Sequence, residues 1–155
     1  MTERARFKSR AANVNDKGPR PYVMECQVGF LMRVAMQRHT SIFMSFMPHK
    51  LTQTQFAVVA KLAEVGTTSQ NQLGRLVCLD AATTKGVVDR LRIRKIVMIE
   101  INPQDRRHSM VSLTKRGARI AKESTRRAHQ ITAKTLAPLK RNEQRTIVQL
   151  LRKMA

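Results

Sequence analysis

The sequence predicts a mainly α-helical fold with one small β-hairpin, because the hydrophobic period changes near the middle of the chain. From Asp80 to Lys95 the apolar residues recur at steps of three and four, which is typical of an amphipathic helix. The period changes to two over residues 97–101 and again over 110–113, which is typical of short strands. The polar segment 102–109 between them would form the tip of the hairpin.

The composition fits a single domain that binds a polyanion. The 155 residues are 42% hydrophobic, enough for a modest core, and they carry a formal net charge of +20. The electrostatic field of such a positive charge attracts nucleic acid, and acidic membrane surfaces are the competing partner. No run approaches about 18 uninterrupted apolar residues, and the basic N-terminus lacks the apolar core of a secretory signal. We therefore expect a cytoplasmic protein without a transmembrane helix.

The N-terminal part is predicted to hold a flexible basic arm and a long helix. Residues 1–19 contain basic side chains without a helical period, and they precede one domain over residues 20–155. The arm would be a solvated tail or an extension that contacts phosphates. The pattern from Pro21 to Met47 predicts a helix that is too apolar to face solvent and too long for one small core. Contact with a second subunit would explain both features.

Two capped helices precede the amphipathic helix described above. Thr52 and Gln55 have the spacing of a capping box, and Gly66 would end that helix. Ser69 is the expected N-cap of a shorter helix, so residues 69–95 form a helix-turn-helix. The hairpin follows at once and carries arginines at its tip, which predicts a winged helix-turn-helix. Its second helix can enter a major groove while the wing reaches the backbone or the minor groove.

Two more helices complete the predicted fold. Thr114 would cap a long helix that runs to about Leu136, and Pro138 would break it. Asn142 and Arg145 open a last helix with an apolar stripe. The winged region cannot cover this stripe alone, so it needs a partner.

Basic residues concentrate around the predicted DNA-reading parts. Between Arg75 and Arg127 there are fourteen basic and five acidic residues, an excess of nine positive charges. A charge run is usually only a solvated face, but its position beside a wing motif indicates DNA contact.

The wing carries a motif that resembles the MarR family of transcriptional regulators. The segment Asp105–Arg107 leads into the short strand 111–113, then Thr114 and Gly117, which is similar to the family pattern of Asp-x-Arg, strand, Leu-Thr and a nearby glycine. The resemblance extends over roughly residues 21–154. Many family members carry a glycine between the recognition helix and the first strand, where this chain has lysine.

The resemblance implies a sequence-specific DNA-binding regulator, most often a repressor. Residues 51–114 would form the winged helix DNA-binding region, and the terminal helices 21–47 and 115–155 of two chains would interlock into a homodimer. Such a dimer binds a pseudo-palindromic site in double-stranded DNA. The segment 18–43 is also similar to a branch of the family that represses genes for nicotinic acid breakdown.

The candidate DNA contacts lie on the wing and on the two helices of the helix-turn-helix. Arg107 matches the family arginine that enters the minor groove, and Asp105 matches the acid that orients the wing. Arg90 and Arg94 share a helix face, and either could instead pair with Asp89 or Asp105. The other candidates have polar or basic side chains able to reach phosphates or base edges: Ser69, Gln70, Gln72, Thr83, Thr84, Lys85, Arg106 and His108.

Two modes of control are open. The family resemblance implies release from DNA when a small aromatic acid or phenol enters a cleft beside the dimer helices. The carboxylate could be held by Arg33, Arg38 or His39, among the apolar side chains of Met36 and Phe43. These charged groups could equally be exposed or paired across the dimer.

The alternative is an oxidant-sensing repressor of the same fold that uses Cys26. This cysteine lies where the oxidant-sensing branch of the family carries its thiol. That branch surrounds the thiolate with further tyrosines, whereas this chain has only Tyr22. The neighbouring Glu25 would lower the reactivity of the thiol.

Other classes of function find little support. There is no glycine-rich phosphate loop, no Gly-x-Ser-x-Gly elbow and no histidine pair at metal spacing, so we expect no enzyme, no cofactor and no metal site. A basic membrane-surface protein would need more apolar bulk on the helix from Thr114 to Leu136. Cys26 and Cys78 match no metal spacing, and we expect both to be small core residues.

Overall fold

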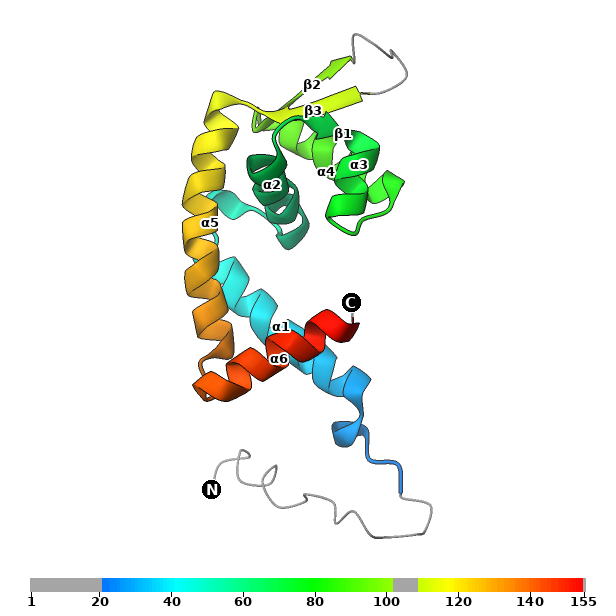
Figure 1. The fold of residues 1–155 in the computed structure, drawn as a ribbon, viewed down its shortest axis with the longest axis vertical. Helices are drawn as coiled ribbons and strands as arrows, with labels where there is room; N and C mark the ends of the chain where they lie inside the picture. Colours follow the sequence, from blue (N-terminus) through cyan, green and yellow to red (C-terminus); the bar gives the residue numbers. More distant parts are fainter. Residues whose placement is uncertain (1–20, 102–108, 155) are drawn as a thin grey trace. The chain divides into compact units, whose positions relative to one another are not determined.

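The computed structural model describes residues 21–101 and 109–154, which are mainly helical with a small antiparallel sheet, as predicted (Figure 1). The chain divides into two compact units, residues 1–34 and 35–155, and each is described here by itself. The helices are η2 (Met24–Cys26), α1 (Val28–Phe46), η3 (Pro48–Lys50), α2 (Gln53–Val65), α3 (Gln70–Leu76), α4 (Ala81–Ile93), α5 (Lys115–Leu136) and α6 (Arg141–Met154). The strands are β1 (Thr68–Ser69), β2 (Val97–Ile101) and β3 (Ser109–Leu113).

In the first unit, the predicted helix from Pro21 begins later than expected. A single 3-10 turn, η2, is followed by Gln27 in an extended conformation, and α1 starts only at Val28. Val23 is also extended, and its carbonyl accepts a hydrogen bond of 3.0 Å from Gln27 Nε2. The start of a helix depends on the backbone conformation of single residues, and this cannot be predicted from the spacing of apolar residues. The basic arm predicted for residues 1–19 lies outside the described residues.

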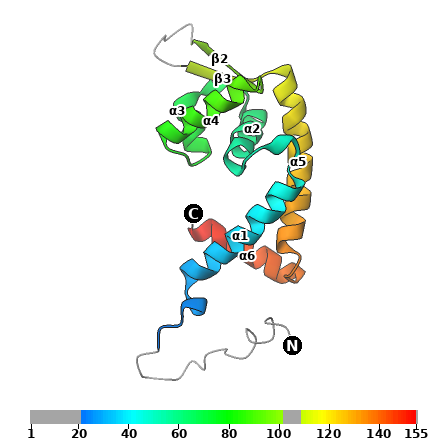
Figure 2. The same ribbon diagram turned by 180° about the vertical axis from the view of Figure 1, so that it is seen from behind.

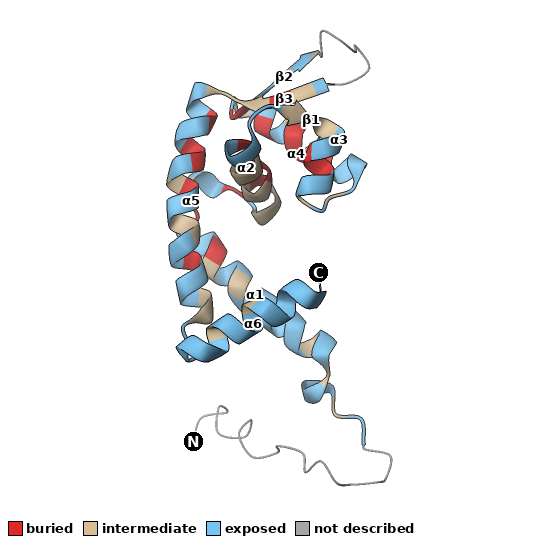
Figure 3. Cartoon of the chain, viewed as in Figure 1, coloured by how far each residue is buried: buried red, intermediate tan, exposed pale blue. Residues whose placement is uncertain are grey.

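In the second unit, α2, α3, α4, the sheet and the first part of α5 share one core. Figure 3 shows the buried residues on the inner faces of these elements, while α6 has none. Complete burial of a Val, Leu or Ile side chain contributes about 1.5–3 kcal/mol. Among the described residues, the apolar side chains with at most 1% exposure are Leu51, Val58, Val59, Leu73, Val87, Val88, Leu91, Ile96 and Val111.

The predicted helix starts are confirmed by their hydrogen bonds. Each of the four cap residues accepts a bond from the backbone N–H three residues later, and the Thr52 box is complete because Gln55 Oε1 accepts from the Thr52 N–H. The caps are Thr52, Ser69, Asp80 and Thr114, with N···O distances of 3.2, 3.2, 2.8 and 2.9 Å.

The sheet has three strands in the order β1-β3-β2, all antiparallel (Figure 1). Figure 2 shows β2 and β3 from behind. The predicted hairpin is confirmed, with Val97 opposite Leu113 and Ile99 opposite Val111. Strand β1 adds Thr68 opposite Val111 on the other side. A strand of two residues is too short to show an alternation, so β1 could not be predicted from the hydrophobic period.

The turn between α4 and β2 is left-handed at the position where the resemblance leads us to expect a glycine. Lys95 has a φ of +56°, in the left-handed region that a Cβ atom disfavours. The Lys95 N–H donates to the Arg92 carbonyl (2.8 Å), and the Ile96 N–H donates to the Leu91 carbonyl (2.9 Å). These two bonds are those of a Schellman motif, so the chain keeps the expected turn although it has lysine in place of glycine.

Gly117 has a steric reason to be glycine. It lies in the first turn of α5, where a Cβ atom would be 1.9 Å from the carbonyl oxygen of Ile96. That carbonyl also accepts hydrogen bonds from the Thr114 N–H (3.1 Å) and hydroxyl (3.2 Å). The start of α5 is therefore seated directly on the backbone between α4 and β2.

Both cysteines are exposed, so the prediction that they belong to the core is wrong. Cys78 lies in the turn between α3 and α4 with a φ of +54°, and Cys26 ends η2 in the first unit. In both places the chain leaves a regular element, and the side chain is no longer directed by a helix face.

Gly117→Ala is expected to lower the free energy of unfolding by about 1–3 kcal/mol, because the methyl group would overlap the Ile96 carbonyl. Gly86→Ala in α4 is the matched control, since its Cβ would meet only the flexible Arg90 side chain at 3.5 Å. A helical glycine with such space should gain about 0.5–1 kcal/mol on replacement by alanine. Urea unfolding followed by circular dichroism measures both. If the two variants have equal free energies of unfolding, α5 can shift away from Ile96 at no cost in stability.

Candidate nucleic-acid interface and neighbouring cavity

Helices α3 and α4 approach each other closely through Gly74 and Thr84. A Cβ atom on Gly74 would be 2.8 Å from Thr84 Oγ1 and 3.1 Å from the Leu79 carbonyl oxygen. Thr84 is 1% exposed, and its hydroxyl donates to the Asp80 carbonyl (2.7 Å). This side chain therefore lies inside the helix-turn-helix, and its burial disfavours the DNA contact that stays a prediction for Thr84.

The N-terminus of α4 presents one exposed threonine. The Asp80 carboxylate accepts from the Thr83 hydroxyl (2.6 Å) and from the Thr83 N–H (2.8 Å), and these bonds lower the pKa of Asp80. A lowered pKa means that the cap stabilises the fold above the ordinary aspartate range and loses this effect as the pH falls through the lowered value. Because the Thr83 hydroxyl hydrogen is already donated, its oxygen is left as an acceptor for a DNA donor.

The outer face of α3 and α4 is polar and basic. Gln72, Thr83, Lys85 and Arg90 are exposed, and Ser69 and Gln70 are half-buried, so six of the predicted DNA contacts reach the surface of the helix-turn-helix. A hollow of about 340 Å³ lies between the two helices. Its lining includes two polar residues that the sequence interpretation missed, Asn71 and Arg75. Arg75 lies three residues after Gln72 on α3, and this helical spacing could have identified it.

Two of the three arginines at the C-terminal end of α4, Arg90 and Arg94, have different surroundings. The Arg90 side chain is exposed and passes over Gly86. Arg94 Nη1 donates to Gln55 Oε1 (3.2 Å), and its Nη2 donates to the His49 carbonyl, so Arg94 binds the protein itself. Asp89 lies 3.8 Å from Arg92, which was not one of its expected partners.

The tip of the wing lies outside the described residues. It contains four of the candidate DNA contacts, so their roles remain predictions: Asp105, Arg106, Arg107 and His108. The strands β2 and β3 that carry this tip are described and pair as predicted.

The second half of α1 and the last part of α5 lie side by side in the second unit. Arg38 Nη2 donates to the Lys134 carbonyl (3.2 Å), and His39 Nδ1 is hydrogen-bonded to the Thr135 hydroxyl (2.9 Å). The Lys134 ammonium lies 4.6 Å from the centre of the Phe46 ring.

A cavity of about 320 Å³ is bounded by α1, α2 and α5. It brings together three of the five predicted ligand contacts, Met36, His39 and Phe43. Arg38 and Arg33 do not line it, since Arg38 binds α5 and Arg33 lies over the Phe30 ring at 5.1 Å. The sequence interpretation missed the walls from the other two helices, which are Gln53, Phe56, Ala128, Ile131 and Thr132.

The cavity has aromatic walls and one ionisable group. The rings of Phe43 and Phe56 are 5.9 Å apart at a tilt of 60°, and the His39 ring lies 6.2 Å from Phe43. His39 is half-buried, and its Nδ1 is engaged by Thr135, so Nε2 is the nitrogen available to a ligand. This arrangement suits a small planar molecule with an anionic end.

A helix-turn-helix whose second helix presents polar residues, followed by an antiparallel hairpin, defines a winged helix-turn-helix DNA-binding protein. The chain belongs to the MarR family, whose model matches residues 51–109, and it is a transcriptional regulator. The resemblance seen in the wing motif is thereby confirmed.

The relatives cover nearly the whole chain. The HTH-type transcriptional repressor NicR of Pseudomonas putida is 38% identical over 135 residues, which are 86% of this chain and 85% of NicR. A probable transcriptional regulator from Pseudomonas aeruginosa has 40% identity and a TM-score of 0.82, over 86% of this chain and all of that chain.

A third relative links the fold to a small molecule. Bordetella bronchiseptica BpsR, whose structure concerns the regulation of its DNA binding by 6-hydroxynicotinic acid, has 40% identity and a TM-score of 0.82. The match covers 87% of this chain and 97% of that chain.

The helices within residues 21–101 and 109–154 include none with the length and hydrophobicity that a membrane span requires.

Proposed function

We propose that the protein is a homodimeric repressor that binds a pseudo-palindromic operator and leaves it when a small aromatic acid fills the cavity beside His39. The observation that carries the proposal is this cavity, with two phenylalanine rings and an imidazole, in a chain 40% identical to BpsR. The preferred ligand would be a hydroxylated pyridine carboxylic acid. The protein would act in the cytoplasm, where the operator is.

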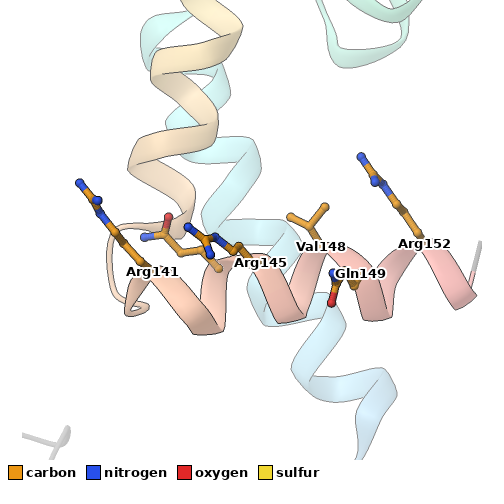
Figure 4. A pocket seen from close by; sticks show the side chains of 6 residues that line it. Arg141, Arg145, Val148, Gln149 and Arg152 are labelled. Atoms are coloured by element: carbon orange, nitrogen blue, oxygen red, sulfur yellow. The ribbon is translucent and has the colours of Figure 1, made fainter.

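The second copy would cover the apolar stripe of α6. This helix has no buried residue, and its large apolar side chains are 36–62% exposed at Ile147, Leu150, Leu151 and Met154. Figure 4 shows another face of α6, where Arg141, Arg145 and Arg152 lie along a hollow of about 560 Å³. A helix with these two faces can bury the apolar one against a partner and keep the arginines in water.

Operator binding would use α4 in the major groove and the wing in the minor groove. Thr83 and Lys85 are exposed at the start of α4, where a recognition helix contacts base edges. Arg107 would enter the minor groove. The net charge of +20 would steer the protein to DNA.

Release would be a shift between two dimer states. An aromatic acid would bind better to a dimer whose winged regions are wrongly spaced for consecutive major grooves. The shift is limited by the ligand's differential affinity, so a tenfold preference at each site yields about 1.4 kcal/mol per site.

Leu150→Glu should convert the protein to a monomer at micromolar concentration, because a carboxylate would replace part of the apolar stripe. Such a monomer should bind an operator half-site only weakly. Gln149→Glu, at the next position of α6, adds the same charge outside the stripe and should remain dimeric. Sedimentation velocity measures both. A wild-type chain that is monomeric and still binds the full operator normally would exclude the dimer.

Arg107→Ala should weaken operator binding by about 1–3 kcal/mol and leave the fold intact, since a wing tip buries little of the core. Lys122→Ala removes an equal charge from an exposed position on α5 and should have a much smaller effect. Fluorescence anisotropy with a labelled operator measures the two dissociation constants. If they change alike, Arg107 has no special role in the groove.

6-Hydroxynicotinic acid should release the operator, and His39→Ala should abolish this response while leaving DNA binding unchanged. Arg38→Ala is the control, because Arg38 is exposed and does not line the cavity. Titration of hydroxylated pyridine and benzene acids into the protein–operator complex measures the response. If no acid releases DNA, while peroxide does so and Cys26→Ser prevents it, the oxidant-sensing alternative replaces the proposal.

A further inference from the structure

The connection between α1 and α2 is held in an unfavourable conformation. His49 and Lys50 are consecutive residues with φ angles of +58° and +49°. The left-handed region is unfavourable for a residue with a Cβ atom, because that atom lies too close to the following carbonyl oxygen. Two such residues in succession persist only where surrounding contacts hold them.

Four side chains hold this connection, and we call them the Arg94 network: Arg94, Gln55, His49 and Glu123. Arg94, the C-cap residue of α4, donates to the His49 carbonyl and to Gln55 Oε1 (3.2 Å). Gln55 is 6% exposed and also accepts from the Thr52 N–H (3.2 Å) at the start of α2. His49 Nε2 donates to Glu123 Oε2 on α5 (2.8 Å). The end of the recognition helix is thus tied to α2 and α5.

The same connection lies between two walls of the cavity. The α1 wall includes Phe43, six residues before His49, and the α2 wall begins at Gln53, four residues after it. On α5, Ala128 lies five residues beyond Glu123. None of the four residues of the Arg94 network lines the cavity. A change in the spacing of α1, α2 and α5 would therefore reach α4 through these bonds.

We propose that Arg94 is a positioning residue that transmits occupancy of the cavity to the recognition helix. This inference rests on the proposed function, since it assigns a route to the same ligand response. The guanidinium is suited to the task because its fork binds two acceptors on different segments at once. Two strained residues next to it provide a conformation that can change when the bond to the His49 carbonyl is lost.

The test measures operator affinity without and with saturating 6-hydroxynicotinic acid. We call the affinity without the acid divided by the affinity with it the release ratio. In Arg94→Lys the charge stays, but one ammonium cannot reproduce the fork. The wild-type ratio should be on the order of ten or more, and Arg94→Lys should reduce it to about three or less. Calorimetry on the protein without DNA should show that the variant still binds the acid.

Two controls separate transmission from stability. Arg92→Lys makes the same substitution two residues earlier, on an exposed side chain, and should keep the wild-type ratio. Val111→Ala removes buried volume from the sheet outside the Arg94 network, so it should lower stability but keep the ratio. If Val111→Ala lowers the ratio as much as Arg94→Lys does, loss of stability alone explains the effect and the inference is wrong.

A second variant removes a different hydrogen bond of the Arg94 network. His49→Asn removes the bond to Glu123 while asparagine tolerates the left-handed conformation. It should also lower the release ratio, and the double variant with Arg94→Lys should lower it little further, because both changes break one route. If Arg94→Lys does not fold, His49→Asn decides the question alone.

The outcomes distinguish the two proposals. A wild-type protein that binds operator but does not respond to any aromatic acid overturns the proposed function, and this inference falls with it. A wild-type protein that responds, together with folded Arg94→Lys and His49→Asn variants that respond equally well, overturns only the role of the Arg94 network.

Discussion

The carbonyl group of Ile96 is the point on which the arrangement of the second unit depends. It accepts from the Thr114 N–H and hydroxyl, while the N–H of the same residue ends α4 by donating to Leu91. Gly117 leaves the space that this contact needs. One residue therefore closes the turn after the recognition helix, directly precedes β2 and contacts the start of α5. Because α5 also forms a cavity wall, the DNA-reading and ligand-binding parts are built on a common support.

Features set by a few neighbouring residues could be predicted from the sequence. The four N-caps and the end of α2 at Gly66 depend on residues within four positions of one another, and the hairpin was found from the alternation within each of its strands. The family motif contributed the wing residues, which no period would have identified. The start of α1 at Val28 was missed because an apolar period continues through residues that are not helical.

Features that depend on distant segments could not be predicted. Thr84 has a polar side chain at the start of a DNA-reading helix, yet the close approach of Gly74 places it inside. Arg94 was expected to bind an acid or DNA, whereas its partners come from residues 49 and 55. The cavity was recognised from α1 alone, because the residues on α2 and α5 are ordinary until the fold brings them together.

The arginine face of α6 has a consequence for how two copies would meet. Arg141, Arg145 and Arg152 lie on the same helix as the apolar stripe, and each chain carries +20 in total. Association therefore brings like charges together, and added salt, by screening this repulsion, would favour the dimer. Salt has the opposite effect on the attraction to DNA phosphates. A duplex would itself neutralise the repulsion, so at low concentration the polyanion would serve as the surface on which the dimer assembles.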